Sequence, residues 1–268
     1  LLGCLTGIIT EEDDDGTRAA RARQERPKSE LPTAHAQAIA NEVRSHDPVH
    51  PMSHHQLPGL VFDFPNAAAA EVFQVQRNVG GAYNVSSLHN DAVTAWENAD
   101  GRYVVNFSEI TSGSTKHGSL SLELQRHINW AVAMGGAYVQ VIDWWVGSDP
   151  PAQAALAQAG HLARFFADTR FDLMEPADFR AAGDTEWVLA HRTGLGNDYF
   201  IGYGRGVFGG LGFNGLDTAT YDLLWLDTES GQTFTEQRTV STAGTFTFPK
   251  PASLTGGELA LYARKAGL

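Results

Sequence analysis

Residues 103–109 read Tyr103-Val104-Val105-Asn106-Phe107-Ser108-Glu109, and this short run indicates the class of fold. Its first six residues have the length and the apolar content of a strand, and a carboxylate follows at once. Similar apolar runs recur along residues 1 to about 175, with helical stretches between them. Strands that alternate with helices predict a mostly parallel sheet. Glu109 therefore stands at the C-terminal end of a strand, which is where barrel-type α/β enzymes place their chemistry.

On both sides of this run the sequence predicts further strands, which makes five in all, at residues 1–10, 50–54, 71–77, 103–108 and 137–144. Helices are expected at residues 18–25, 33–45, 89–98, 120–134 and 151–169. Five such units cannot close an eight-stranded barrel. Because the chain opens abruptly on an apolar run without Met, we expect the C-terminal part of a (β/α)8 TIM barrel, about strands 4–8. An open α/β sheet is the alternative.

The second half of the chain has a different composition, rich in Thr, Gly, Phe and Tyr. Short strands are expected at residues 186–192, 199–204, 220–227, 232–240, 244–248 and 258–263. A turn is expected at residues 227–231, because Asp and Ser bond locally and Gly accepts a positive φ. These features predict a small antiparallel β-sandwich. The expected domains are residues 1–175, a partial barrel, and residues 184–268, the sandwich.

Composition excludes several classes of function. Of the 268 residues, 43% are hydrophobic and 19% charged, which is typical of a globular protein. The net charge of −12 argues against a nucleic-acid partner, which requires basic patches. Cys4 is the single cysteine, so an internal disulfide framework is excluded. No apolar run is long enough to span a membrane. The oligomeric state stays open.

Two carboxylates are the expected catalytic groups. Glu109 is the first, and Glu11 or Glu12, which follow the apolar run at residues 1–10, is the second. Hydrolysis of a glycoside with retention uses two carboxyl groups about 5–5.5 Å apart. Asp143 is an alternative catalytic acid at the end of another expected strand. Residues 11–15 are all acidic, and such runs also form plain solvated loops. Their spacing matches no Ca²⁺ loop, so we expect no metal and no cofactor.

Polar and aromatic side chains follow the other expected strands. Imidazole and amide groups can hydrogen-bond sugar hydroxyls, and indole faces stack on sugars. The zinc spacing of His50 and His54 works only on a helix, which Pro51 opposes. Core packing or a plain surface loop is the alternative for each of these side chains. The candidate substrate-binding residues are His54, His55, Gln76, Asn78, Trp144 and Trp145.

Several short motifs, taken in order, resemble a known family. They are Thr10-Glu11-Glu12-Asp13, Asp47-Pro48-Val49-His50-Pro51, Asn106-Phe107-Ser108-Glu109-Ile110 and Gly135-Gly136-Ala137. They are similar to motifs of clan A-like bacterial glycoside hydrolase barrels, namely the apiosidase-like group and related proteins of unknown function. The stretches 220–231 and 244–248 resemble the C-terminal sandwich that carries the label collagen-binding domain. No residue here shows collagen recognition.

The resemblance implies roles for the acidic residues. Glu109 would be the nucleophile, and Glu11 or Glu12 the acid/base, in hydrolysis of O-glycosidic bonds in a poly- or oligosaccharide. It also implies a secreted, periplasmic or cell-surface location. One departure stands out, because the family has Trp-Asn ahead of its Gly-Glu-Glu and this chain has Gly7 and Ile8. That departure favours the alternative of a non-catalytic carbohydrate-binding protein with the same architecture.

Overall fold

The computed structural model describes residues 31–56, 59–62, 71–79, 84–111, 120–139 and 150–268. Several predictions lie outside these residues. They include the strand at residues 1–10, the helix at residues 18–25, and the candidate residues Glu11, Glu12, Asp143, Trp144 and Trp145.

The first part of the described chain contains a parallel sheet of four strands in the order β1-β2-β3-β4. The strands are β1 (Ser53–Gln56), β2 (Val72–Asn78), β3 (Val104–Thr111) and β4 (Tyr138–Val139). The helices are α1 (Leu31–His46), α2 (Val85–Ala99), α3 (Leu122–Met134) and α4 (Pro150–Ala167). The predicted alternation of parallel strands and helices is confirmed over these residues.

Local sequence signals explain where α2 and α3 begin. The side chain of Asn84 accepts a hydrogen bond from the Ser87 N–H, and Ser121 accepts one from the Leu124 N–H. Such caps satisfy backbone donors that the first turn of a helix leaves free. After α3 the chain turns at Gly136, which has φ +80°, and a Cβ there would lie 2.6 Å from the Trp96 ring. Glycine therefore allows the chain to enter β4 close against α2.

The second part of the chain, which we call the β-region (residues 174–268), contains two antiparallel sheets. Its six-stranded sheet has the order β11-β10-β13-β8-β7-β5, and its three-stranded sheet the order β12-β9-β6. Two short 3₁₀ helices, η1 (Phe171–Leu173) and η2 (Asp178–Arg180), lie before and after strand β5. The strands are β5 (Met174–Pro176), β6 (Ala181–Gly183), β7 (Trp187–His191), β8 (Tyr199–Arg205), β9 (Gly210–Leu216), β10 (Ala219–Asp227), β11 (Thr233–Val240), β12 (Gly244–Pro249) and β13 (Glu258–Lys265).

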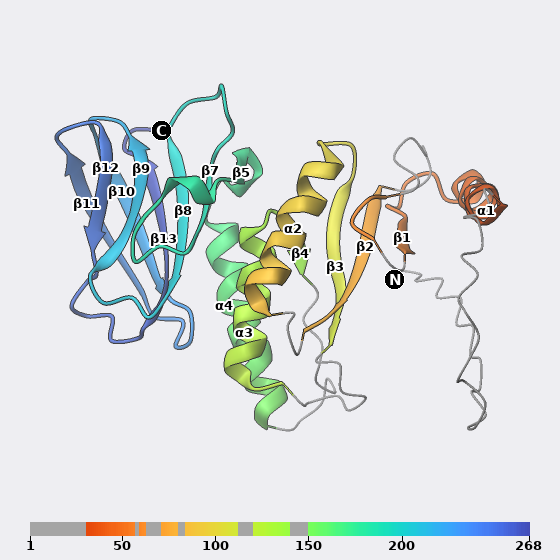
Figure 1. The fold of residues 1–268 in the computed structure, drawn as a ribbon, viewed down its shortest axis with the longest axis horizontal. Helices are drawn as coiled ribbons and strands as arrows, with labels where there is room; N and C mark the ends of the chain where they lie inside the picture. The colour runs from red at the N-terminus through yellow and green to blue at the C-terminus, as the bar shows by residue number, and fades with distance from the viewer. Residues whose placement is uncertain (1–30, 57–58, 63–70, 80–83, 112–119, 140–149) are drawn as a thin grey trace, which may run out of the picture.

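The six-stranded sheet is buried on both faces where β7, β8 and β13 lie. In β8, Tyr199, Ile201 and Tyr203 join a core that also contains residues of α2, α3 and the parallel sheet. The intervening Phe200 joins a second core between the two antiparallel sheets. Successive strand residues point to opposite faces, so one strand supplies both cores. Figure 1 shows the result, with α2, α3 and α4 between the parallel sheet and the β-region.

The strands predicted for the β-region are confirmed, but three short strands were missed. The missed strands are β5, β6 and β9. The β5 and β6 strands precede residue 184, the expected start of the second domain. The predicted turn at residues 227–231 is confirmed, since Asp227 Oδ1 accepts from the N–H groups of Glu229 and Ser230 and Gly231 has φ +76°.

Candidate active site

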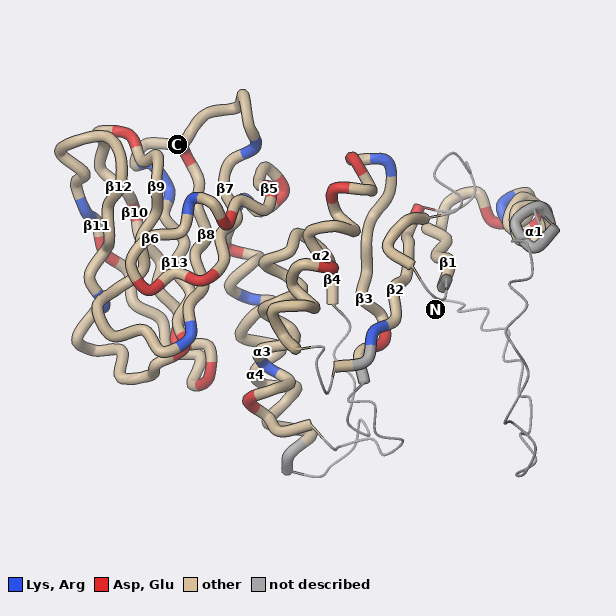
Figure 2. The backbone as a smooth tube through the Cα atoms, viewed as in Figure 1, with Lys and Arg blue, Asp and Glu red and all other residues tan. Residues whose placement is uncertain are grey.

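The candidate site lies at the edge of the parallel sheet where β1, β2 and β3 end. Parallel strands share one direction, so their C-terminal ends meet at one edge. Figure 2 shows charged residues at the ends of β2 and β3, while the middle of each strand is uncharged. Glu109 belongs to this edge and is exposed. The sequence predicted a strand that stops before Glu109, whereas β3 continues to Thr111.

A β-bulge decides which way Glu109 faces. Val75 of β2 is in register with Phe107, but the next residue, Gln76, is in register with Glu109. Ser108 is therefore the extra residue of the bulge. Without it, strict alternation would turn Glu109 toward the same face as Val105 and Phe107, which are buried against the helices. The bulge instead places Glu109 on the opposite face, which we call the open face because it turns away from α2 and α3.

Gln76 shares the open face with Glu109. Its register partner is Glu109, and its neighbours Val75 and Arg77 point the other way. Arg77 shows this directly, because its Nε donates to Asp91 Oδ2 of α2 at 2.6 Å. The structure thus brings two of the predicted site residues, Gln76 and Glu109, to adjacent positions on one face.

A second polar row crosses the open face one step nearer the start of the strands. His55 is in register with Gln74, Gln74 with Asn106, and Asn106 with Tyr138. Residues in register on neighbouring strands point to the same face. The row gives imidazole and amide groups next to Gln76 and Glu109, whereas the Tyr138 ring at its end lies edge-on to Phe171, with centroids 6.3 Å apart. Gln74, Asn106 and Tyr138 were not among the predicted site residues, although the alternation of Val72 to Arg77 placed Gln74 opposite the apolar positions.

The two adjacent histidines of β1 separate. His54 is in register with Phe73, a fully buried residue on the helix side, and its ring centroid is 6.2 Å from that of Phe62. His55 is exposed on the open face. Because successive strand residues alternate, two neighbouring histidines cannot both face one site. The prediction that His54 enters the site is therefore corrected, since the structure brings His55 alone to the open face.

The remaining predicted site residues have different positions. Asn78 is the last residue of β2 and is in register with Thr111. His50 lies in a turn beside Asp47, whose carboxylate accepts from the His50 side chain at 2.8 Å. Hydrogen bonds from the His50 side chain and backbone lower the pKa of Asp47. This motif therefore forms a local turn before β1.

The predicted partners of Glu109 lie outside the described residues. They are Glu11, Glu12, Asp143, Trp144 and Trp145. In the described residues, no group of three His, Cys, Asp or Glu side chains could hold a metal ion. No helix among them is both long and apolar enough to cross a membrane.

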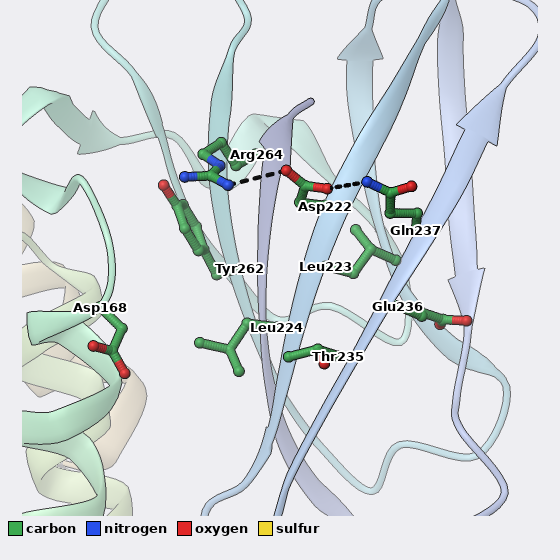
Figure 3. A pocket seen from close by; sticks show the side chains of 9 residues that line it. All are labelled: Asp168, Asp222, Leu223, Leu224, Thr235, Glu236, Gln237, Tyr262 and Arg264. Atoms are coloured by element: carbon green, nitrogen blue, oxygen red, sulfur yellow. Dashed lines mark hydrogen bonds and ion pairs between the residues drawn. The ribbon is translucent and has the colours of Figure 1, made fainter. Parts of the chain in front are cut away.

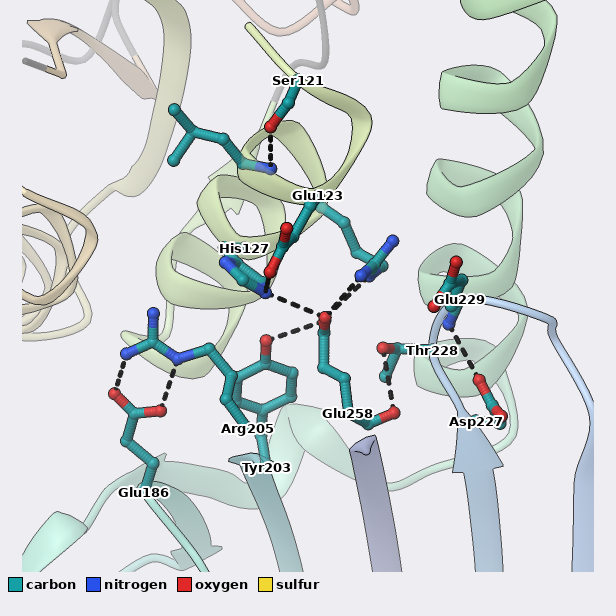
Figure 4. A network of polar contacts seen from close by, with 12 residues as sticks. Ser121, Glu123, His127, Glu186, Tyr203, Arg205, Asp227, Thr228, Glu229 and Glu258 are labelled. Carbon is teal, nitrogen blue, oxygen red and sulfur yellow. Dashed lines mark hydrogen bonds and ion pairs between the residues drawn. The ribbon is translucent and has the colours of Figure 1, made fainter. Parts of the chain in front are cut away.

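A second carboxylate, Glu258 at the start of β13, was missed by sequence reasoning. It is buried between α3 and the β-region and accepts hydrogen bonds from Arg126 Nε at 2.8 Å, His127 Nε2 at 2.9 Å and the Tyr203 hydroxyl at 2.8 Å (Figure 4). Burial raises its pKa, but the hydrogen bonds and charges of His127 and Arg126 outweigh burial and hold the pKa at about 2. Its partners come from α3 and from β8, so this carboxylate joins two parts of the chain.

A stack of aromatic rings also joins α2 and α3 to the β-region. Trp130 of α3 stacks on Tyr203 with centroids 5.0 Å apart, Tyr203 on Trp187 at 5.2 Å, and Trp187 on His89 of α2 at 4.5 Å. The two nitrogens of His89 lie 2.8 Å from the Ala131 carbonyl oxygen and 2.7 Å from Asp178 Oδ2. These contacts fix the β-region against α2 and α3, behind the sheet that carries Glu109.

Comparisons with known proteins identify the fold. No family model matches the chain, and no curated protein matches it. A solved structure described as a glycoside hydrolase is 17% identical with a TM-score of 0.58, and the match covers 88% of this chain and 62% of that one. A family 5 glycoside hydrolase from Bacteroides vulgatus ATCC 8482 is 16% identical with a TM-score of 0.59, covering 88% and 60%.

The chain spans less than two thirds of the length of either protein. At these identities the likeness concerns the fold. The chain shares its fold with these two solved structures, and in it a parallel α/β region is joined to antiparallel sheets.

Proposed function

We propose that the chain takes part in the hydrolysis of O-glycosidic bonds in a poly- or oligosaccharide, and that Glu109 is the nucleophile. One observation carries the proposal. The bulge at Ser108 turns Glu109 onto the open face at the C-terminal ends of the parallel strands. In barrel enzymes that edge carries the catalytic groups. The proposal includes a closed (β/α)8 barrel, of which residues 1–175 supply part, and a β-sandwich at residues 184–268.

In the proposed retaining reaction, the Glu109 carboxylate attacks the anomeric carbon while the bond to the leaving oxygen breaks. Glu11 or Glu12 gives its proton to that oxygen. The same group then takes a proton from water, which attacks the anomeric carbon and releases Glu109. Gln76 and His55 would hydrogen-bond sugar hydroxyls, and Asn78, Trp144 and Trp145 would complete the binding surface. No metal or organic cofactor enters this reaction.

The test replaces Glu109 with Gln in the full-length protein. Release of reducing ends from a panel of oligosaccharides should fall by about a thousandfold or more, because the attacking oxygen loses its charge. The Glu97→Gln variant, an exposed carboxylate on α2, is the matched control and should keep full activity. A 2-fluoroglycoside should label the peptide that contains Glu109, as mass spectrometry would show. Undiminished turnover by Glu109→Gln contradicts the assignment.

A second candidate function is carbohydrate binding without hydrolysis. Gly7 and Ile8 stand where the resembled family has Trp-Asn, and this specific departure favours it. The two candidates differ in one experiment. If glycans bind but neither reducing ends nor a labelled Glu109 peptide is found, the second candidate holds. A labelled Glu109 peptide excludes it.

The resemblance to the apiosidase-like group supports two further parts of the proposal. They are a bacterial origin and a secreted, periplasmic or cell-surface location. The net charge of −12 agrees with a neutral saccharide as partner and with the absence of a nucleic-acid partner.

A further inference from the structure

A groove of about 560 Å³ lies on the six-stranded sheet beside the end of α4. Strands β10, β11 and β13 form its floor, and Asp168, just after α4, lies across from them (Figure 3). The parallel sheet, whose strand β3 contains Glu109, lies on the other side of the helix layer (Figure 1). The groove is therefore separate from the candidate active site.

The floor of the groove is built from two rows of side chains in register. In the first row, Gln237 of β11, Asp222 of β10 and Arg264 of β13 are neighbours. In the second, Leu224 of β10 lies next to Tyr262 of β13. Register partners share a face, so all five side chains point to the same side of the sheet.

The first row has a fixed geometry. Gln237 Nε2 donates to Asp222 Oδ1 at 2.7 Å, and an Arg264 terminal nitrogen donates to Asp222 Oδ2 at 3.0 Å. The hydrogen bond from Gln237, followed by that from Arg264, lowers the pKa of Asp222. A carboxylate held between two planar donors loses little further freedom when a ligand binds. The pair stays within reach of solvent, since Arg264 is 41% exposed and Asp222 30%.

The row keeps hydrogen-bonding capacity of both kinds. An amide group has two N–H donors and one acceptor oxygen, and a guanidinium has five N–H donors. Gln237 and Arg264 each use one donor group on Asp222. The remaining N–H groups of the Gln237 amide and of the Arg264 terminal nitrogens, with the Gln237 amide oxygen, can bind hydroxyl groups, which both donate and accept.

Charge narrows the class of ligand. Asp168, Asp222 and Glu236 contribute three negative charges to the lining and Arg264 one positive charge. A phosphate or other anion would meet net repulsion. Burial raises the pKa of Tyr262 to about 12, so its hydroxyl is neutral. Leu224 is the half-buried apolar contact between these polar groups. The lining therefore matches a neutral molecule with many hydroxyl groups.

We propose that this groove binds a neutral saccharide chain at a second site, away from the strand ends that carry Glu109. Gln237, Asp222 and Arg264 bind its hydroxyl groups, and Leu224 contacts the apolar face of a sugar ring. Such a site would hold a polysaccharide on the β-region while another part of the same polysaccharide occupies the open face. The groove depends on none of the groups proposed for hydrolysis.

Affinity electrophoresis of the full-length protein tests the proposal. The gels contain soluble xylan, mixed-linkage β-glucan, galactomannan or arabinogalactan, and the protein carries Glu109→Gln so that no chain is cut. At least one polysaccharide should retard the protein. Gln237→Ala should weaken that retardation about tenfold in dissociation constant, the effect of one lost polar contact. Gln232→Ala, an exposed glutamine just before β11, is the matched control and should bind like the parent.

A second variant guards against an effect on folding. Asp222→Ala with Arg264→Ala removes both charges together, so neither is left without its partner, and circular dichroism checks that the fold is kept. This variant should lose binding as well. The proposal is overturned if no gel retards the protein, or if Gln237→Ala and Gln232→Ala are retarded equally. Retardation that depends on Gln237, together with no release of reducing ends by the protein that keeps Glu109, would support the groove and contradict the proposed hydrolysis.

Discussion

Glu258 and Glu109 lie in two different regions, but their local sequences are similar, since each is a glutamate at one end of an apolar strand. Glu258 is buried and accepts from Arg126, His127 and Tyr203. Glu109 is exposed on the open face beside the amide of Gln76. A buried charge is tolerated where a full set of partners offsets the loss of hydration, and removing one partner then destabilises the fold. An exposed carboxylate on a polar sheet edge is available for a substrate.

Replacing Glu258 should have the largest effect on the stability of the protein. The Glu258→Ala variant leaves the buried Arg126 and His127 without their acceptor, so its free energy of unfolding should fall by about 3–5 kcal/mol. Urea unfolding followed by tryptophan fluorescence measures it. Glu229→Gln is the control, because this exposed carboxylate lies near Arg126, and it should change stability by less than about 0.5 kcal/mol. A loss below 1 kcal/mol for Glu258→Ala would contradict the assigned role.

Acid should reduce the stability that Glu258 gives to the contact between α3 and the β-region. The pKa of Glu258 is about 2 in the fold, below its ordinary value of 4.5. A carboxylate with a lowered pKa stabilises the fold above its unfolded pKa and loses that effect as pH falls. Its contribution, about 3 kcal/mol at one pKa unit per 1.36 kcal/mol, should therefore be complete above about pH 5 and disappear toward pH 2.

Urea unfolding of the parent and of Glu258→Gln between pH 6 and pH 3 checks this expectation. The stability difference between the two proteins should shrink as pH falls. A difference that stays constant over this range would show that Glu258 is not the group that titrates.

The smallest of the expected effects is a decrease in activity when Gln76, on the open face, is replaced. Gln76→Ala removes an amide beside Glu109, so kcat/KM should fall about tenfold, which corresponds to about 1.4 kcal/mol. The free energy of unfolding should stay within about 0.5 kcal/mol, because the side chain is only half-buried. Gln232→Ala should change neither quantity. If Gln76→Ala instead lowered stability and left the activity unchanged, the contrast between the two regions would fail.

The position of Glu109 along its strand could be predicted from the sequence, but the direction of its side chain could not. The apolar run before it predicts the strand, and six residues suffice for that. The bulge at Ser108 depends on the register with β2, which begins 32 residues earlier, at Val72. A one-residue change of register turns a side chain to the other face. Adjacent site candidates such as His54 and His55 are separated for the same reason.

Glu258 and β9 show two other limits. The partners of Glu258 lie 55, 131 and 132 residues away in the sequence, so no local pattern indicates them. The β9 strand was missed because Gly210, Gly212 and Gly215 lower the strand signal. The structure requires glycine at position 212, where a Cβ would lie 2.6 Å from the Phe246 carbonyl oxygen. Residues chosen for close packing can therefore hide the element that they form.

The β8 strand, with side chains in two cores, limits how the protein can be divided in the laboratory. A cut near residue 184 would expose Trp187, Tyr199, Ile201 and Tyr203 on one fragment and Trp130 on the other. Large apolar patches of this kind promote aggregation. The β-region is therefore a poor candidate for exchange between proteins as a module, and useful chimaeras would have to carry α2 and α3 along with it.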